Sequence, residues 1–99
     1  MRYAITRAVS SAINQCELTH FSRTPIDLSL ARKQHHAYEA VLQSLGCQLI
    51  PLPEEPTLPD SVFVEDAAIV LDEVALITRP GAVSRRPETP SIAAALTPY

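Results

Sequence analysis

Three carboxylates fall within seven residues of the chain, at Asp60, Glu65 and Asp66, and an apolar run follows them at once. The rest of this stretch, residues 60–66, has the composition of a buried β-strand. Carboxylates at the edge of a core are costly unless they are paired or bind a cation. Because successive side chains of a strand point to opposite faces, Glu65 and Asp66 can serve one ligand only where the strand bends, bulges or ends. The alternative is a strand end with two solvated acids.

A second charged cluster follows in the loop of residues 79–90, where Arg85 and Arg86 are adjacent. Two arginines ahead of a predicted helix start suit the binding of a carboxylate or a phosphate. The alternative is a solvated loop with an Arg–Glu surface pair, which would contribute little to stability. Acids on one side and arginines on the other would together suit a zwitterionic amino acid with a cationic side chain.

Length and composition restrict the class of protein. The 99 residues suffice for one small domain, and 46 % hydrophobic content argues against general disorder. A net charge of −3 provides no basic surface for nucleic acid. With two cysteines, no secretion signal and no membrane-length apolar run, we expect a reduced, cytoplasmic chain without a disulfide framework or a membrane partner. The histidine and cysteine spacings make no metal site, and we expect no cofactor.

The predicted elements include both strands and helices. We expect a helix at residues 27–45, because apolar residues recur at three- and four-residue steps. Either Thr24 or Asp27 could cap its start, and Gly46 suits its end. The other elements are strands at residues 3–7 and 47–52, a hairpin of residues 67–71 and 74–78 around a two-residue turn, and a short helix at residues 91–96. This order, β-α-β-β-β-α, predicts an α/β module with a mixed sheet.

The long helix is expected to pack its apolar face onto a sheet that contains the strands at residues 47–52 and 67–78. The face comprises Ala31, His35, Tyr38, Leu42 and Leu45. We interpret His35 as a hydrogen-bonded core histidine rather than a ligand.

Three groups of residues carry a more specific signal: PDSVFVED at residues 59–66, ITRPG at residues 77–81 followed by SRR at residues 84–86, and Gln34-His35 with Ala37-Tyr38 on the helix. They resemble the N-terminal part of the dimethylarginine dimethylaminohydrolases, and the resemblance covers essentially the whole chain. It implies that residues 1–99 are a single module of a longer enzyme of the guanidine-modifying pentein superfamily, built as an α/β propeller. Such enzymes hydrolyse methylated arginine to citrulline and a methylamine.

By position, the resemblance implies substrate-binding roles for six residues. Glu65 and Asp66 would hold the substrate guanidinium, whose planar fork suits carboxylates. Asp60 would take the α-amino group of a guanidine amino acid, and Arg85 its α-carboxylate. The remaining two are Leu18, in a mobile loop that closes over the substrate, and Phe63, which lines the pocket.

The same resemblance places the catalytic residues outside this chain. In the family, a cysteine near the C-terminus attacks the guanidinium carbon and a histidine in a later unit acts as general acid and base. Neither Cys16 nor Cys47 matches that nucleophile, so we expect no catalytic residue here. Two alternatives stay open: a relative that deiminates arginine or transfers its amidino group, and a truncated, non-catalytic binding module. A propeller unit alone would leave apolar surface uncovered, so we expect marginal stability or self-association into a homo-oligomer.

Overall fold

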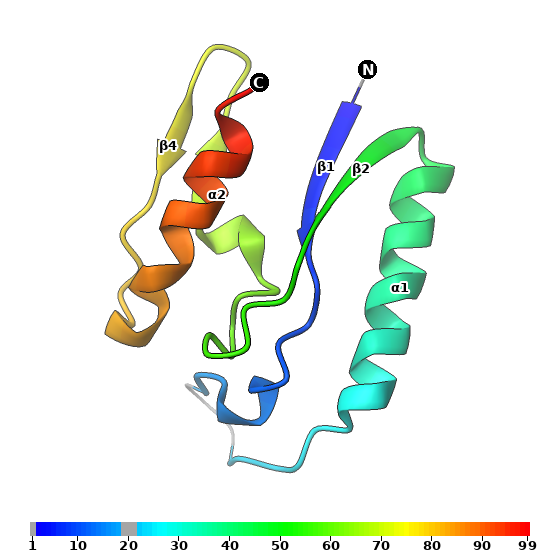
Figure 1. Cartoon of the computed structure of the whole chain (residues 1–99), viewed down its shortest axis with the longest axis vertical. Helices are drawn as coiled ribbons and strands as arrows, with labels where there is room; N and C mark the ends of the chain where they lie inside the picture. Colours follow the sequence, from blue (N-terminus) through cyan, green and yellow to red (C-terminus); the bar gives the residue numbers. More distant parts are fainter. Residues whose placement is uncertain (1, 19–21) are drawn as a thin grey trace.

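The N-terminal half of the protein is a parallel strand pair with its crossover helix. The computed structural model describes residues 2–18 and 22–99. Strand β1 (Arg2–Arg7) pairs in parallel with β2 (Cys47–Leu52), from Arg2 opposite Cys47 to Arg7 opposite Leu52. Parallel neighbours need a crossover connection, and helix α1 (Leu28–Ser44) supplies it along one side of the pair (Figure 1). Both strands and the helix agree with the sequence prediction.

Helix α1 is capped by Asp27, one of the two residues that the sequence predicts for this role, and ends before Gly46, as predicted. The Asp27 side chain accepts a hydrogen bond of 3.0 Å from the Leu30 backbone N–H and so satisfies one free donor of the first turn. At the other end Gly46 has a φ of 91°, a left-handed conformation that side-chain-bearing residues rarely adopt. These two residues therefore define the helix ends.

The buried face of α1 differs from the predicted face. Tyr38 is 52 % exposed and Leu45 71 % exposed, so the prediction that they pack inward is wrong. Glu39 lies on the inner side instead, where its carboxylate accepts a hydrogen bond of 2.5 Å from the Thr6 hydroxyl. A polar side chain with a partner can occupy an inward position that apolar periodicity assigns to a neighbour. The half-buried residues that share this side are Leu28, Ala31, His35, Glu39 and Leu42.

The C-terminal half contains a separate hairpin and a second helix. Strands β3 (Ala68–Val70) and β4 (Ala75–Ile77) are antiparallel, and a hydrogen bond of 2.9 Å from Leu71 N–H to the Val74 carbonyl closes the predicted two-residue turn. Helix α2 (Thr89–Leu96) contacts both strands and confirms the order β-α-β-β-β-α. Among the described residues, β3–β4 and β1–β2 form two sheets, so the prediction of one mixed sheet is wrong.

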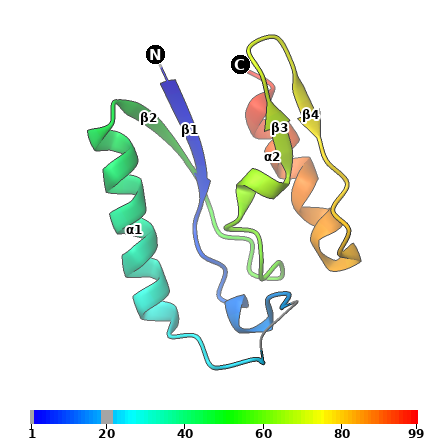
Figure 2. The same cartoon turned by 180° about the vertical axis from the view of Figure 1, so that it is seen from behind.

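The separation of the two sheets has a local cause. The connection between β2 and β3 folds into successive turns and a short 3₁₀ helix, η2 (Val64–Asp66), instead of continuing as an extended strand. Figures 1 and 2 show the result from opposite sides: α1 lies on one side of the β1–β2 pair, and the hairpin with α2 lies on the other. The sheet on which α1 packs is therefore the parallel pair, and the prediction that this sheet includes the hairpin strands is wrong.

The centre of the molecule is unusually polar. The buried apolar side chains of the described residues are Val9, Ile13, Cys16, Ala67 and Ile92, and they are matched by buried polar ones: Thr6, Arg7, Ser10, Asp60, Ser61 and Glu88. The end of β1, the connection before β3 and the start of α2 thus meet around hydrogen bonds and ion pairs. Within residues 2–18 and 22–99, no helix is long and apolar enough to cross a membrane.

Candidate ligand-binding site

The acidic stretch is a series of tight turns, not a strand. Backbone hydrogen bonds run from Phe63 to Asp60 at 3.0 Å, from Asp66 to Phe63 at 3.2 Å and from Ala67 to Val64 at 3.1 Å, all with i→i+3 spacing. The strand prediction for residues 60–66 is therefore wrong. Successive residues of a 3₁₀ turn point about 120° apart, so Glu65 and Asp66 still diverge.

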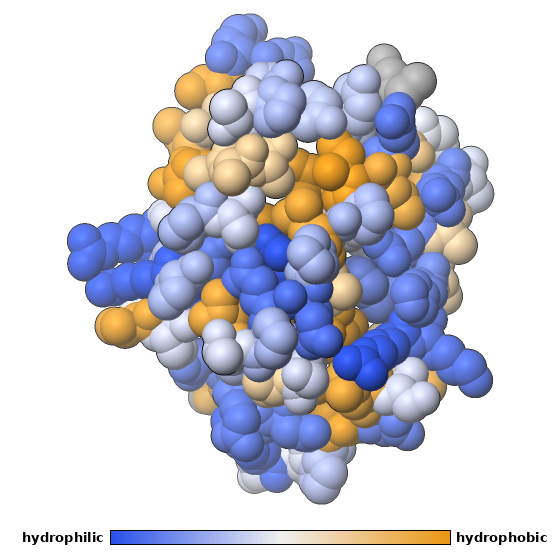
Figure 3. Space-filling model, in the orientation of Figure 1, coloured by the Kyte–Doolittle hydropathy of each residue, from blue (hydrophilic) through white to orange (hydrophobic). Residues whose placement is uncertain are grey.

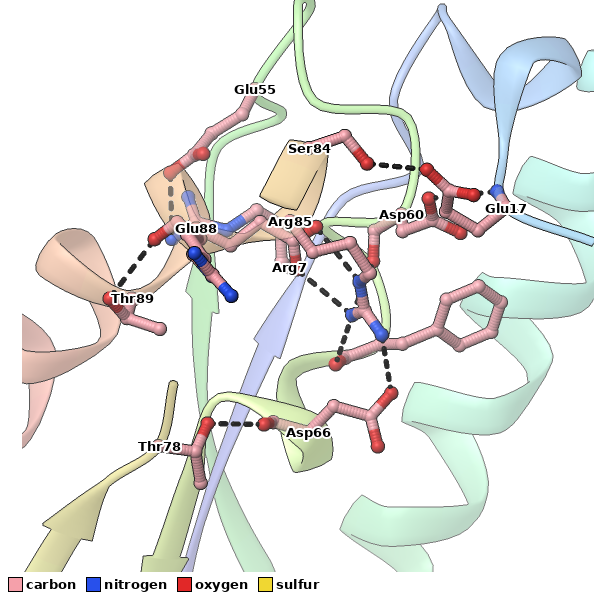
Figure 4. A network of polar contacts seen from close by, with 12 residues as sticks. Arg7, Glu17, Glu55, Asp60, Asp66, Thr78, Ser84, Arg85, Glu88 and Thr89 are labelled. Atoms are coloured by element: carbon pink, nitrogen blue, oxygen red, sulfur yellow. Dashed lines mark hydrogen bonds and ion pairs between the residues drawn. The ribbon is translucent and has the colours of Figure 1, made fainter. Parts of the chain in front are cut away.

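Arg85 holds this turn from a distance in the sequence. Its Nη1 donates to Asp66 Oδ2 at 2.7 Å, and its Nη2 donates to the carbonyl oxygens of Asp60 at 3.2 Å and Phe63 at 3.3 Å (Figure 4). The Arg85 side chain is only 14 % exposed. The predicted arginine and three residues of the acidic stretch therefore lie together.

Glu88 binds the other edge of the same guanidinium. Its two carboxylate oxygens accept from Arg85 Nε at 3.0 Å and Nη2 at 2.9 Å, and its side chain is 5 % exposed. The interpretation of this cluster as a solvated Arg–Glu surface pair is therefore wrong. The hydrogen bonds to Glu88 and Asp66 raise the pKa of Arg85 above its ordinary value, although burial alone would lower it. Arg85 therefore stays charged.

Asp60 and Glu17 complete one side of the cleft. The Asp60 carboxylate accepts a hydrogen bond of 3.1 Å from the Glu17 backbone N–H, and Glu17 Oε1 accepts one of 2.5 Å from the Ser84 hydroxyl. A cleft of about 450 Å³ lies here, and its lining residues are Glu17, Asp60, Phe63, Asp66, Pro80, Gly81, Ala82 and Arg85. Glu17 was not predicted; its position directly before Leu18 is the one signal in the sequence that could have indicated it.

Glu65 faces a different cavity. This second space, of about 600 Å³, lies against α1, and its lining residues are Ile5, Thr6, Gln34, His35, Tyr38, Val62, Phe63, Val64 and Glu65. Phe63 lines both cavities. The structure thus brings Asp60, Phe63, Asp66 and Arg85 together but leaves Glu65 outside that group.

Leu18 directly follows the cleft residue Glu17 in the chain, and it is 42 % exposed. The residues that follow it in the predicted closing loop, residues 19–21, lie outside the described residues. Its role in substrate binding stays a prediction.

Among the described residues, no cysteine or histidine lines this cleft. Cys16 is buried, Cys47 is half-buried, both are free, and neither lines the two cavities. His35 Nε2 lies 3.7 Å from Glu39 Oε2 on the inner side of α1. Over the part of the chain that the structure describes, no group of three or more His, Cys, Asp and Glu residues could hold a metal ion.

Comparison with known proteins gives these residues a context. No family model matches the chain. The dimethylarginine dimethylaminohydrolase of Streptomyces coelicolor is 43 % identical over 89 residues, which cover 90 % of this chain and 34 % of that protein. The enzyme of the same name from Pseudomonas aeruginosa is 48 % identical over 63 residues, 64 % of this chain and 25 % of that protein.

The solved structures give the same result. A mutant of the Pseudomonas aeruginosa enzyme complexed with citrulline superposes with a TM-score of 0.91 at 36 % identity, over 98 % of this chain and 38 % of that one. An adduct of a dimethylarginine dimethylaminohydrolase with S-methyl-L-thiocitrulline gives a TM-score of 0.89 at 35 % identity, over 98 % of this chain and 38 % of that one. The chain spans about a third of the length of the curated relatives that it matches. It is therefore homologous to part of the dimethylarginine dimethylaminohydrolases and shares their α/β fold over that part.

Proposed function

We propose that residues 1–99 are a single module, the N-terminal substrate-binding part of a hydrolase of methylated arginine. The reaction yields citrulline and a methylamine, and the protein acts in cytoplasmic arginine metabolism as part of a pentein-type enzyme. The observation that carries the proposal is the cleft in which Arg85 meets Asp60 and Asp66, in a chain homologous to enzymes of this name. Two free cysteines agree with a reducing compartment.

The charges of the cleft match the two ends of a cationic amino acid. Arg85 binds the α-carboxylate of the ligand, Asp60 binds its α-amino group, and Asp66 binds its guanidinium. Phe63 packs against the ligand's methylene groups, and Leu18 covers the bound ligand. Glu65 reaches the guanidinium only after the turn of residues 64–66 rearranges, because it faces the neighbouring cavity.

Ligand entry must open the contact between Asp66 and Arg85. These two side chains are 2.7 Å apart, whereas the methylene chain of arginine separates its carboxylate from its guanidinium. A ligand held at both ends therefore replaces one internal ion pair with two intermolecular ones. Each charge-assisted contact contributes about 1.5–3 kcal/mol at best, and the lost pair and the association entropy offset much of this. We expect millimolar or weaker affinity for the 99-residue chain.

A non-catalytic binding role for the isolated chain is favoured by one observation: neither cavity is lined by a cysteine. A nucleophilic thiolate needs a lowered pKa and a nearby base. Turnover therefore depends on residues beyond these 99.

The test uses a chimera in which this chain replaces the matching third of the Streptomyces coelicolor relative. We expect the chimera to release citrulline and a methylamine from methylarginine, and the 99-residue chain alone to release neither. Release of ammonia from arginine would instead identify a deiminase, and transfer of the amidino group to an amine would identify an amidinotransferase. Citrulline production by the 99-residue chain, abolished by Cys16→Ser or Cys47→Ser, would overturn the assignment of the nucleophile to another part of the protein.

A further inference from the structure

One edge of the Arg85 guanidinium, formed by Nε and Nη2, is occupied by Glu88. Five N–H groups surround this planar cation. Glu88 engages Nε and Nη2 side-on, the bidentate arrangement that fixes both the position and the plane of a guanidinium. Nη2 also reaches the carbonyl oxygens of Asp60 and Phe63. The remaining corner, Nη1, contacts Asp66 at the cleft, so this is the end that an incoming carboxylate can reach.

Glu88 is itself held firmly. It is 4 % exposed and lies at the junction of the 3₁₀ helix η3 (Val83–Glu88) and α2. The Ser91 hydroxyl lies 3.3 Å from the Glu88 carbonyl oxygen and 2.6 Å from Glu55 Oε1, and it accepts a hydrogen bond of 2.6 Å from Arg7 Nη2. Arg7 is 3 % exposed and pairs with Glu55 at 3.2 Å. The backbone of Glu88, which carries the carboxylate bound to Arg85, is thereby connected to the end of β1.

We propose that Glu88 is a positioning residue that orients Arg85 for recognition of a ligand α-carboxylate. The inference rests on the proposed function, because it assumes that Arg85 binds that carboxylate. Glu88 does not line the cleft. It acts through Arg85, whose Nη1 it directs toward Asp66 and the cleft. Without this partner, the long Arg85 side chain would sample other rotamers. It would then lose that conformational entropy when it binds a ligand.

The test is an NMR titration of the 99-residue chain with methylarginine and, separately, with its α-carboxamide. The parent chain should bind the acid more tightly than the amide, by about fivefold for a partly screened ion pair. Glu88→Gln keeps the shape of the side chain and deletes its charge, so this preference should fall toward one. Glu73→Gln is the matched control, because Glu73 is exposed in the β3–β4 turn, and it should keep the preference of the parent.

If Glu88 had only a structural role, its substitution would lower the affinity for both ligands equally. An unchanged acid-to-amide ratio in Glu88→Gln, whatever the absolute affinity, would overturn the inference. If Glu88→Gln does not fold, Glu88→Asp keeps the charge but is too short to reach Nε and Nη2 together. The same loss of preference is expected there, and its retention would contradict the inference.

A second readout separates this inference from the proposed function. Hydrogen exchange of the Arg85 Nε–H should be slow in the parent, where Glu88 accepts it, and fast in Glu88→Gln. If the parent binds neither ligand, the proposed binding role fails. In that case fast exchange in the variant still supports the positioning contact, and unchanged exchange overturns it.

Discussion

Asp66 has two partners that compete: Arg85 in the free chain and, in the proposed complex, the ligand guanidinium. Asp66→Asn should therefore weaken binding of the ligand guanidinium and leave Arg85 freer to bind the ligand carboxylate. In the chimera we expect the KM for methylarginine to rise about fivefold, because a half-exposed charge pair contributes about 1 kcal/mol. The kcat should fall less if the loss is mainly in binding.

Citrulline distinguishes the two effects. It has a carboxylate for Arg85 but a neutral side chain, so Asp66→Asn should leave its inhibition constant unchanged or improve it by releasing Arg85. Glu73→Gln serves again as the control and should alter neither constant. Equal KM values for methylarginine in the Asp66→Asn variant and the parent would refute a guanidinium-binding role for Asp66.

At the residue scale, the sequence predicts only part of the site. Asp60, Phe63, Asp66 and Arg85 were predicted from their types and from the family resemblance, and the structure brings them together. Glu17 was missed because its contact with Asp60 spans 43 residues of sequence. Glu88 was considered only as the surface partner of an arginine, because the burial of its carboxylate depends on the fold. The Arg85–Glu88 contact is local in sequence, but the burial that strengthens it is not.

At the scale of elements, the helix ends were predictable because capping is local. Asp27 and Gly46 each act on backbone within a few residues, and both predicted ends of α1 agree with the structure. The turn of residues 60–66 was not predictable in this way, since Arg85 binds two of its carbonyl groups from more than 20 residues away. The inner face of α1 was misassigned for the same reason: Thr6 stabilises Glu39 across 33 residues.

Gly46 gives a direct test of this local control. Its φ of 91° is strained for any residue with a Cβ, although a Cβ there would meet no atom within 4 Å. Gly46→Ala should therefore lower the free energy of unfolding by about 1–2 kcal/mol through backbone strain alone.

Gly81→Ala is the matched control for Gly46→Ala. A Cβ at Gly81 also has open space, and its φ is outside the left-handed region, so the variant should be neutral or slightly stabilised. Urea denaturation of the three proteins measures both differences. Similar losses for the two alanine variants would show that the glycine conformation does not determine the end of α1.

At the scale of the whole molecule, the chain exposes much of its apolar surface. On α1, Tyr38, Val41 and Leu45 are 52 %, 56 % and 71 % exposed. On the hairpin, the cross-strand partners Ile69 and Leu76 are 55 % and 53 % exposed. Figure 3 shows several apolar groups (orange) on the upper half of one face. This exposure follows from having two small sheets with few buried apolar side chains among the described residues.

This exposure predicts how the 99-residue chain behaves alone and when joined to more protein. We expect the isolated chain to be marginally stable and to self-associate at micromolar concentration, as measured by sedimentation velocity and thermal unfolding. In the chimera, the remaining two thirds of a homologous enzyme should cover part of the same surface. Self-association and the binding of a hydrophobic dye, each counted per chain, should therefore fall. Because the buried polar contacts around Arg7 and Arg85 lie within the chain, they should persist in both forms. A monomeric 99-residue chain that unfolds cooperatively well above room temperature would show that its polar centre alone suffices to stabilise the fold.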